Sequence, residues 1–204
     1  MADTPAVISA KDVAELRRRT GAGMMDCKRA LAESGGDFDK ATEWLRARGV
    51  ARANKVADRA AKEGVIESYL HHSGKIGVLV ELDCETDFVA RTEDFRQLAR
   101  DLAIQIAATA PLAVSVDQVP ADVVERERRI YTEQAAQEGK PEAIRPRIVE
   151  GKLKKFYAEA VLLEQPFVKE DSRSVGDLVK AVSAKVGENV VVRRFVRYQI
   201  GEQG

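Results

Sequence analysis

The segment Ile76–Cys84 reads IGVLVELDC, and apolar residues occupy all of its even positions. The odd face carries the charged residues Glu81 and Asp83. Because successive side chains of a β-strand point to opposite faces, this alternation predicts a half-buried strand. We expect Val65–His71 to pair with it as a hairpin whose turn is Ser73–Lys75.

Two helices and a last strand complete the expected body around this hairpin. Apolar residues recur with helical spacing in Glu93–Ala110, and Val175–Val186 forms a second helix. The last strand is expected to carry one apolar face, made of Val190, Val192, Val196, Tyr198 and Ile200. The pattern therefore predicts a small antiparallel sheet packed with helices, in the α+β class.

Residues 1–50 predict a bundle of three short amphipathic helices. Ser9 is a good N-cap for the first helix, which stops near Thr20–Gly23. The second helix stops at Ser34–Gly36, and Asp37 caps the third. Three amphipathic helices within about fifty residues make a minimal bundle.

The third helix is expected to end before Gly49, and residues 51–63 to form an exposed linker, either helical or irregular. This range is rich in Ala, Arg and Lys and has no clear apolar stripe, a pattern more typical of a solvated segment than of a core. The body then spans residues 64–204.

Two charged helices inside that body predict a projecting hairpin at about residues 120–160. They cover Ala121–Glu138 and Glu142–Ala160, with Gly139-Lys140 between them. A short turn between two long, mostly polar helices favours an antiparallel arrangement away from the core.

The composition excludes several classes of protein. Apolar residues make up 45% of the chain and charged residues 32%, which indicates a globular domain. Basic and acidic residues balance at 33 each, so no net field favours nucleic acid or a membrane surface. Met1–Ala10 lacks the pattern of a secretion signal, and Cys27 and Cys84 are too few for a disulfide framework. We therefore expect a cytoplasmic protein without membrane or direct nucleic-acid contacts.

The sequence offers little for catalysis and suggests no cofactor or metal. Gly74-Lys75 is followed by Ile76 and lacks the upstream glycine of a phosphate-binding loop. Only His71 and His72 could serve as histidine ligands, and neighbours on a strand point to opposite faces. Cys84 fits a buried, inert cysteine better than a reactive thiol.

Two segments indicate a function more specifically than the rest of the sequence does. Met24 and Met25 open the second helix directly after a glycine-bounded turn, where they either pack in the core or offer an adaptable surface to a partner. In Cys84–Arg91 a strand runs into an acid and an aromatic residue. Phe88 then either returns to the core or lies exposed beside a charge.

Four segments in order resemble the elongation factor Ts family, and the resemblance extends over nearly the whole chain. They are Thr20–Leu31, Thr86–Val89 with the sequence TDFV, Gly151–Phe156 and Gln165–Val168. The resemblance implies a ubiquitin-associated-like (UBA-like) bundle, an α+β core and an antiparallel coiled coil. It also implies a function: binding elongation factor Tu with GDP, displacing its magnesium ion and promoting exchange for GTP.

The resemblance implies site residues as well. Arg17, Met24 and Met25 correspond to a contact of the bundle with the GTPase, and Thr86, Asp87, Phe88 and Val89 to the turn that disturbs the magnesium and phosphate site. Val186 and Gly187 correspond to a contact loop, and His71 to a histidine at the hairpin tip. Lys55 is followed by Val56, where relatives often carry a second basic residue, and longer relatives have further C-terminal modules.

Two other functions remain open at this point. The chain could be a UBA-like binding module without exchange activity, or a thiol or metal enzyme that uses Cys27, Cys84 and the histidines. We also expect a homodimer, because a three-stranded sheet has exposed edges and the last strand is strongly apolar.

Overall fold

The computed structural model describes residues 8–202. The expectation that Met1–Ala10 is not a secretion signal therefore concerns residues that lie mostly outside the described part. Its first three helices are α1 (Ala10–Thr20), α2 (Met24–Glu33) and α3 (Phe38–Val56). Ser9 and Asp12 form a capping box at α1, and the Asp37 carboxylate accepts hydrogen bonds from two backbone N–H groups of α3. The three helices share a buried cluster of Val13, Leu16, Cys27, Ala30, Leu31 and Ala41.

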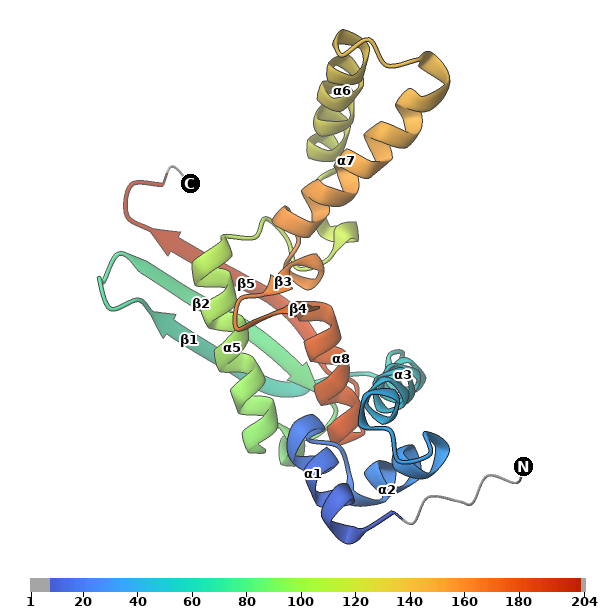
Figure 1. Ribbon diagram of the computed structural model, residues 1–204. Helices are drawn as coiled ribbons and strands as arrows, with labels where there is room; N and C mark the ends of the chain where they lie inside the picture. The colour runs from blue at the N-terminus through green and yellow to red at the C-terminus, as the bar shows by residue number, and fades with distance from the viewer. Residues whose placement is uncertain (1–7, 203–204) are drawn as a thin grey trace, which may run out of the picture.

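Helix α3 does not end before Gly49 but continues to Val56, so the helical alternative for the linker holds over its first residues, whereas the expectation that it is exposed throughout is wrong. Ala53 and Val56 are buried, because this half of α3 packs along α8 (Val175–Val186), as Figure 1 shows. Glycine within a helix costs only about 1 kcal/mol relative to alanine, which packing offsets. The helix therefore runs through Gly49, which is not a helix stop.

The main sheet has three antiparallel strands in the order β1 (Glu63–Leu70), β2 (Ile76–Cys84) and β5 (Val191–Gln199). The hairpin β1–β2 and the α+β class agree with the sequence prediction. Helices α5 (Glu93–Thr109) and α8 cover one face of the sheet (Figure 1). The apolar stripe of α5 packs in the same buried cluster as the core-facing residues of the strands.

The predicted apolar face of β5 is wrong in its second half. The strand has a β-bulge opposite Glu81 and Leu82, which adds Arg193 to one strand without a partner on the other. A bulge of this kind shifts the side-chain alternation by one position. Val192 and Phe195 consequently pack toward the core, whereas Val196, Tyr198 and Ile200 are exposed on the opposite face.

The remaining elements form a helical hairpin and its base. Helices α6 (Ala121–Gln137) and α7 (Arg145–Ala160) pack against each other and project away from the sheet (Figure 1). Lys152 of α7 donates to Gln134 of α6 at 2.9 Å. The shorter elements are α4 (Asp87–Ala90), η1 (Val116–Gln118), η2 (Glu142–Ile144), η3 (Leu162–Glu164), β3 (Pro166–Phe167) and β4 (Glu170–Ser174).

Buried amides attach this hairpin to the core. The Gln105 Nε2 of α5 donates to Gln165 Oε1 at 3.0 Å, and Gln165 Nε2 donates to the carbonyl oxygen of Glu159 at 2.7 Å. Both glutamines are almost fully buried, so these hydrogen bonds are needed to offset the cost of burying their polar groups. Among the described residues, no helix is both long and apolar enough to cross a bilayer.

Candidate partner-binding site

The turn Thr86–Val89 follows the end of β2 and presents Phe88 to solvent. Thr86 caps the single helical turn α4, where its hydroxyl oxygen accepts a hydrogen bond from the Val89 N–H at 3.4 Å. Successive residues of a helix are about 100° apart around its axis, so neighbours can face in different directions. Val89 is buried, whereas the Phe88 side chain is 77% exposed. The alternative that Phe88 returns to the core is therefore wrong.

Asp87 precedes Phe88 and is the first residue of the same helical turn, α4. Its carboxylate forms an ion pair with the Arg91 guanidinium at 2.6 Å. Both side chains are largely exposed, so solvent screens this pair and it contributes little to stability. Asp87 is thus available to a charged partner at a small cost.

The loop after α8 is joined to this turn by two reciprocal contacts. The Glu188 carboxylate accepts hydrogen bonds from the N–H groups of Glu85 at 3.0 Å and Thr86 at 3.1 Å. In return, the Glu85 carboxylate accepts one from the Asn189 N–H at 2.8 Å. Val186 and Gly187 directly precede Glu188, so the structure brings these predicted contact residues next to the Thr86–Val89 turn.

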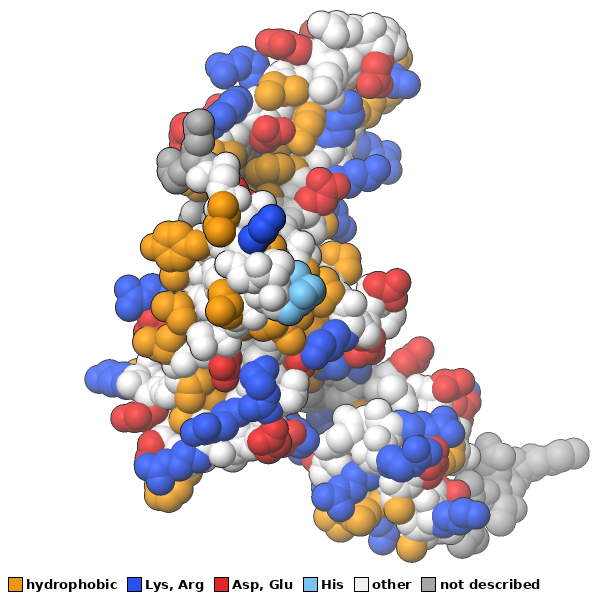
Figure 2. All heavy atoms as spheres, turned by 90° about the vertical axis from the view of Figure 1, so that its left-hand side faces the viewer, with side chains coloured by type: hydrophobic (Ala, Val, Ile, Leu, Met, Phe, Trp, Pro, Cys, Tyr) orange, Lys and Arg blue, Asp and Glu red, His pale blue; other side chains and the backbone are white. Residues whose placement is uncertain are grey.

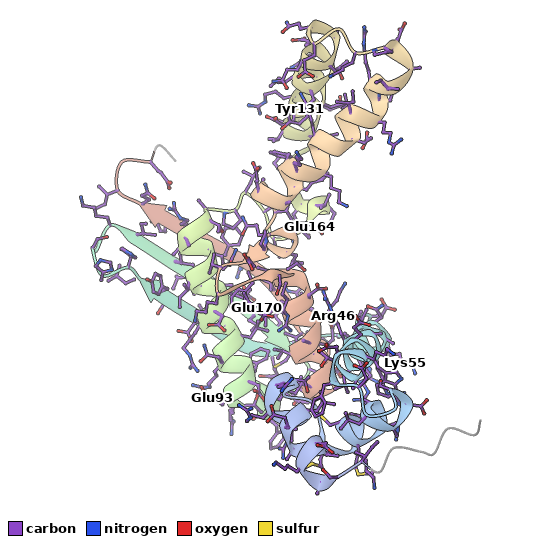
Figure 3. All side chains as sticks on the ribbon, in the orientation of Figure 1. Arg46, Lys55, Glu93, Tyr131, Glu164 and Glu170 are labelled. Atoms are coloured by element: carbon purple, nitrogen blue, oxygen red, sulfur yellow. The ribbon has the colours of Figure 1, made fainter. Side chains whose placement is uncertain are left out.

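The same loop also holds the end of α3. The Asn189 side-chain amide donates to the carbonyl oxygens of Ala57 at 2.9 Å and Arg59 at 2.7 Å. Nearer the N-terminus of α3, the Arg46 guanidinium pairs with Asp177 of α8 at 2.7 Å, where the two helices lie side by side (Figure 3). The bundle and the core are therefore connected at both ends of the α3–α8 contact.

The predicted methionine contact lies at the exposed start of α2. Met24 is 46% exposed and Met25 is 67% exposed, so these side chains are not simply core residues. Met24 and Arg17 line an open depression of about 400 Å³ between the bundle and the end of α8, together with Ala14, Arg18, Gly21 and Lys185. Lys185 also pairs with Asp94, at the start of α5, at 2.6 Å.

His71 lies away from these groups, in the turn that connects β1 to β2. Its Nδ1 atom is 2.8 Å from the Ser73 hydroxyl oxygen. The rings of His71 and His72 are 4.0 Å apart, so the expectation that they point to opposite faces is wrong. They belong to the turn and not to the strand, so strand alternation does not apply to them.

The thiols are poorly suited to catalysis. Cys27 and Cys84 are both free and buried, in separate clusters. Burial raises the pKa of the Cys84 thiol to about 11, and the negative charge of Glu188 adds to the rise. Burial also raises the pKa of Cys27. Residues 8–202 contain no group of three or more His, Cys, Asp or Glu side chains arranged to hold a metal ion.

Exposed apolar side chains held on well-anchored elements are typical of a protein that works by binding a partner. The comparisons with known proteins identify the family. The profile of the family described as "Elongation factor TS" matches residues 41–202. The chain belongs to the elongation factor Ts family, and it is therefore a translation elongation factor.

Curated relatives extend this match over the three N-terminal helices. Elongation factor Ts of Desulforamulus reducens is 58% identical over 197 residues, which cover 97% of this chain and 91% of the relative. Elongation factor Ts of Fervidobacterium nodosum is 56% identical over 195 residues, which cover 96% of this chain and 99% of the relative.

Sequence reasoning did not identify Lys185, Glu188 or Asn189. Lys185 lines the depression beside Met24, and the other two connect the α8 loop to the turn and to α3. All three belong to the segment Ala184–Asn189, whose resemblance to the family drew attention only to Val186 and Gly187. Their partners are distant in sequence, so no local pattern could show these contacts.

Proposed function

We propose that this chain is the guanine nucleotide exchange factor for elongation factor Tu. It binds the GTPase with GDP, displaces the magnesium ion, and promotes release of GDP and exchange for GTP. The observation that carries the proposal is the exposed Phe88 on a turn anchored from two sides. A large aromatic side chain left in water on an ordered element gains free energy when a partner covers it.

Thermodynamic linkage explains how binding alone drives release. A protein that weakens nucleotide binding by some factor must bind the nucleotide-free partner more tightly by the same factor. Burial of one Phe contributes about 1.5–3 kcal/mol, which corresponds to a hundredfold or so at most. Phe88 therefore needs additional contacts, and displacement of magnesium supplies a further electrostatic contribution because the ion neutralises the phosphates.

In this proposal each group of residues has its own role, set by its position in the fold. Arg17, Met24 and Met25 anchor the partner at a UBA-like bundle, within the predicted range 1–50. The Thr86–Val89 turn acts near the magnesium and phosphate site, with Val186 and Gly187 beside it. His71 makes a separate contact from the hairpin tip, and the helices α6 and α7 form a coiled coil.

In this proposal the chain uses no cofactor, metal or catalytic group of its own, and it acts in the cytoplasm without membrane or direct nucleic-acid contacts. The alternative is a UBA-like module that binds a partner without exchange activity. Stopped-flow release of labelled GDP from elongation factor Tu separates the two functions. Exchange activity predicts faster release as this protein is added, whereas a simple binding module predicts an unchanged release rate.

We also propose that two copies of the chain associate through the outer face of the sheet, the face opposite α5. Six large apolar or aromatic side chains on or next to this face are exposed: Ile66, Leu70, Leu79, Val196, Tyr198 and Ile200. Figure 2 shows hydrophobic side chains gathered beside the pale-blue histidine at the hairpin tip, in the same part of the molecule. A twofold axis would cover both faces at once, because each copy presents the same surface.

Sedimentation of the wild type and of Leu79→Lys tests this association. Leu79 is on the central strand of the face and is 47% exposed, so a lysine there leaves the fold intact but places like charges together in a dimer. A dimeric wild type and a monomeric variant support the proposal. A wild type that sediments only as a 22.4 kDa species at micromolar concentration contradicts it.

A further inference from the structure

Residues Glu85 and Thr86 leave the sheet before the chain reaches Phe88. The β1–β2 pairing ends at Cys84, and the β2–β5 pairing ends at Asp83. The N–H groups of Glu85 and Thr86 therefore have no partner strand, and both donate to the Glu188 carboxylate, at 3.0 and 3.1 Å. A single side chain replaces the sheet as the hydrogen-bond partner at this point.

Glu188 also orients the hydroxyl group that caps the turn. Thr86 Oγ1 donates its proton to Glu188 Oε1 at 2.7 Å. Because a hydroxyl has only one proton, this bond leaves the oxygen lone pairs free to accept from the Val89 N–H, 3.4 Å away. A chain of hydrogen bonds thus leads from Glu188 to the Thr86 hydroxyl, and from this hydroxyl to the backbone of the helical turn that carries Phe88.

The position of Glu188 is itself well determined. It follows Gly187, which ends α8 in the left-handed conformation at φ 77°, a conformation that favours glycine. The backbone carbonyl of Glu188 accepts a hydrogen bond from the buried Ser183 hydroxyl at 2.6 Å. The backbone of Glu188 is therefore fixed to α8, and through α8 to the core of the protein, and its carboxylate reaches the turn from that fixed position.

We propose that Glu188 is a positioning residue, which holds the Thr86–Val89 turn in the conformation that presents Phe88 to the partner. The inference rests on the proposed exchange function and adds a residue to it. Glu188 does not need to touch the partner. Without its carboxylate, the turn presents Phe88 for a smaller fraction of the time. Because the bundle still anchors the partner in this proposal, the maximal exchange rate falls with that population while the apparent affinity changes little.

The test measures GDP release over a range of exchange-factor concentrations, for the wild type, Glu188→Ala and Glu188→Gln. For Glu188→Ala we expect a maximal rate about tenfold lower, with a half-maximal concentration within about twofold of the wild type. A glutamine keeps one acceptor oxygen, so Glu188→Gln should recover part of the rate. General damage to the fold would instead lower the amount of active protein and would not be rescued by glutamine.

Two further variants make the test specific. Asp101→Ala is the matched control, because this α5 carboxylate also accepts two side-chain hydrogen bonds, from Gln97 and Lys169, but does not contact the turn. It should keep the wild-type rate. If Glu188 acts through Phe88, the double variant Phe88→Ala/Glu188→Ala should be no slower than Phe88→Ala alone.

Hydrogen exchange of the free protein provides a readout that does not depend on activity. In Glu188→Ala, the amides of Glu85, Thr86 and Val89 should exchange faster than in the wild type, while amides in the middle of β2 keep their protection. Unchanged exchange at these amides would overturn the inference. So would an additive double variant, or a Glu188→Ala rate equal to the wild type while Phe88→Ala is slow. If the wild type itself fails to accelerate release, the proposed function is wrong and the positioning role with it.

Discussion

Gly49 of α3 lies so close to Ala184 of α8 that a Cβ atom built on the glycine would be 3.7 Å from the alanine Cβ atom. This distance is an ordinary van der Waals contact, so a methyl group at position 49 would fit against Ala184 without a clash. The contact connects the helix that completes the bundle to the helix that ends at the Val186–Gly187 loop. It therefore helps to fix the methionine contact relative to Phe88.

Replacement of Gly49 by Ala should raise the free energy of unfolding by about 0.5–1 kcal/mol. Alanine reduces the conformational freedom of the unfolded chain and has space beside Ala184. Gly151→Ala is the matched control, because Gly151 is also within a helix and a Cβ there would meet nothing within 4 Å. Urea unfolding measures the free energy of unfolding of both variants, and Gly151→Ala gives the effect of the same substitution at a helix position without a neighbour. A loss of stability in Gly49→Ala alone would mean that α3 and α8 tolerate no added methyl group.

Cys84 should resist alkylation in the folded protein. With a pKa of about 11, roughly one thiol in a thousand is ionised at pH 8, and the thiolate is the reactive form. Iodoacetamide labelling followed by mass spectrometry should therefore be slow in buffer and fast in urea. Because the folded state holds this proton more tightly, the contribution of Cys84 to stability is constant at neutral pH and falls as the pH rises above about 9. Equal labelling in buffer and urea would revive the thiol-enzyme alternative.

Local patterns in the sequence were sufficient for most of the helices and for the hairpin. The alternation of Ile76–Cys84 identified β2, and the cap residues Ser9 and Asp37 located helix starts. Such features depend on residues a few positions apart, which is why they can be read without the structure.

The misjudged features depend on contacts between distant residues. The bulge at Arg193 reverses the faces of the second half of β5, although the sequence there alternates in the ordinary way. Gly49 resembles a helix stop until α8 is beside it. Likewise, Glu188 contacts Thr86 across 102 positions of the chain, so the support of the turn was hidden.

The exposed methionine pair should contribute affinity and not stability. The double variant Met24→Ala/Met25→Ala should weaken binding to elongation factor Tu, because both side chains are free to enter a partner surface. Binding is measured by titration calorimetry and stability by urea unfolding. Leu16→Ala, at a fully buried position of the same bundle, is the contrasting control and should cost about 2–5 kcal/mol of stability. A loss of several kcal/mol in the methionine variant, with unchanged affinity, would contradict the contact.

The Thr86–Val89 turn should act on the rate of exchange more than on affinity. Phe88→Ala should slow stimulated GDP release by about one to two orders of magnitude, which follows from the burial of one Phe in the opened site. Because the side chain is 77% exposed in the free protein, its removal should leave the free energy of unfolding nearly unchanged. Most of the affinity should also remain, since the bundle anchors the partner.

Asp87→Ala tests the electrostatic part of the same prediction. We expect a smaller effect than for Phe88→Ala, and one that depends on magnesium, because a carboxylate near the ion can disturb its water ligands. Arg91→Ala is the control, since it breaks the same ion pair but keeps the carboxylate. If the effect comes from magnesium, a chelator should make Asp87→Ala and the wild type equally fast, whereas a defect that persists in chelator would assign Asp87 to packing or to direct contact. Two outcomes for Phe88→Ala would contradict the role of the turn. Release at the wild-type rate would show that the turn does not open the nucleotide site, and unfolding of the variant would show that Phe88 is a packing residue.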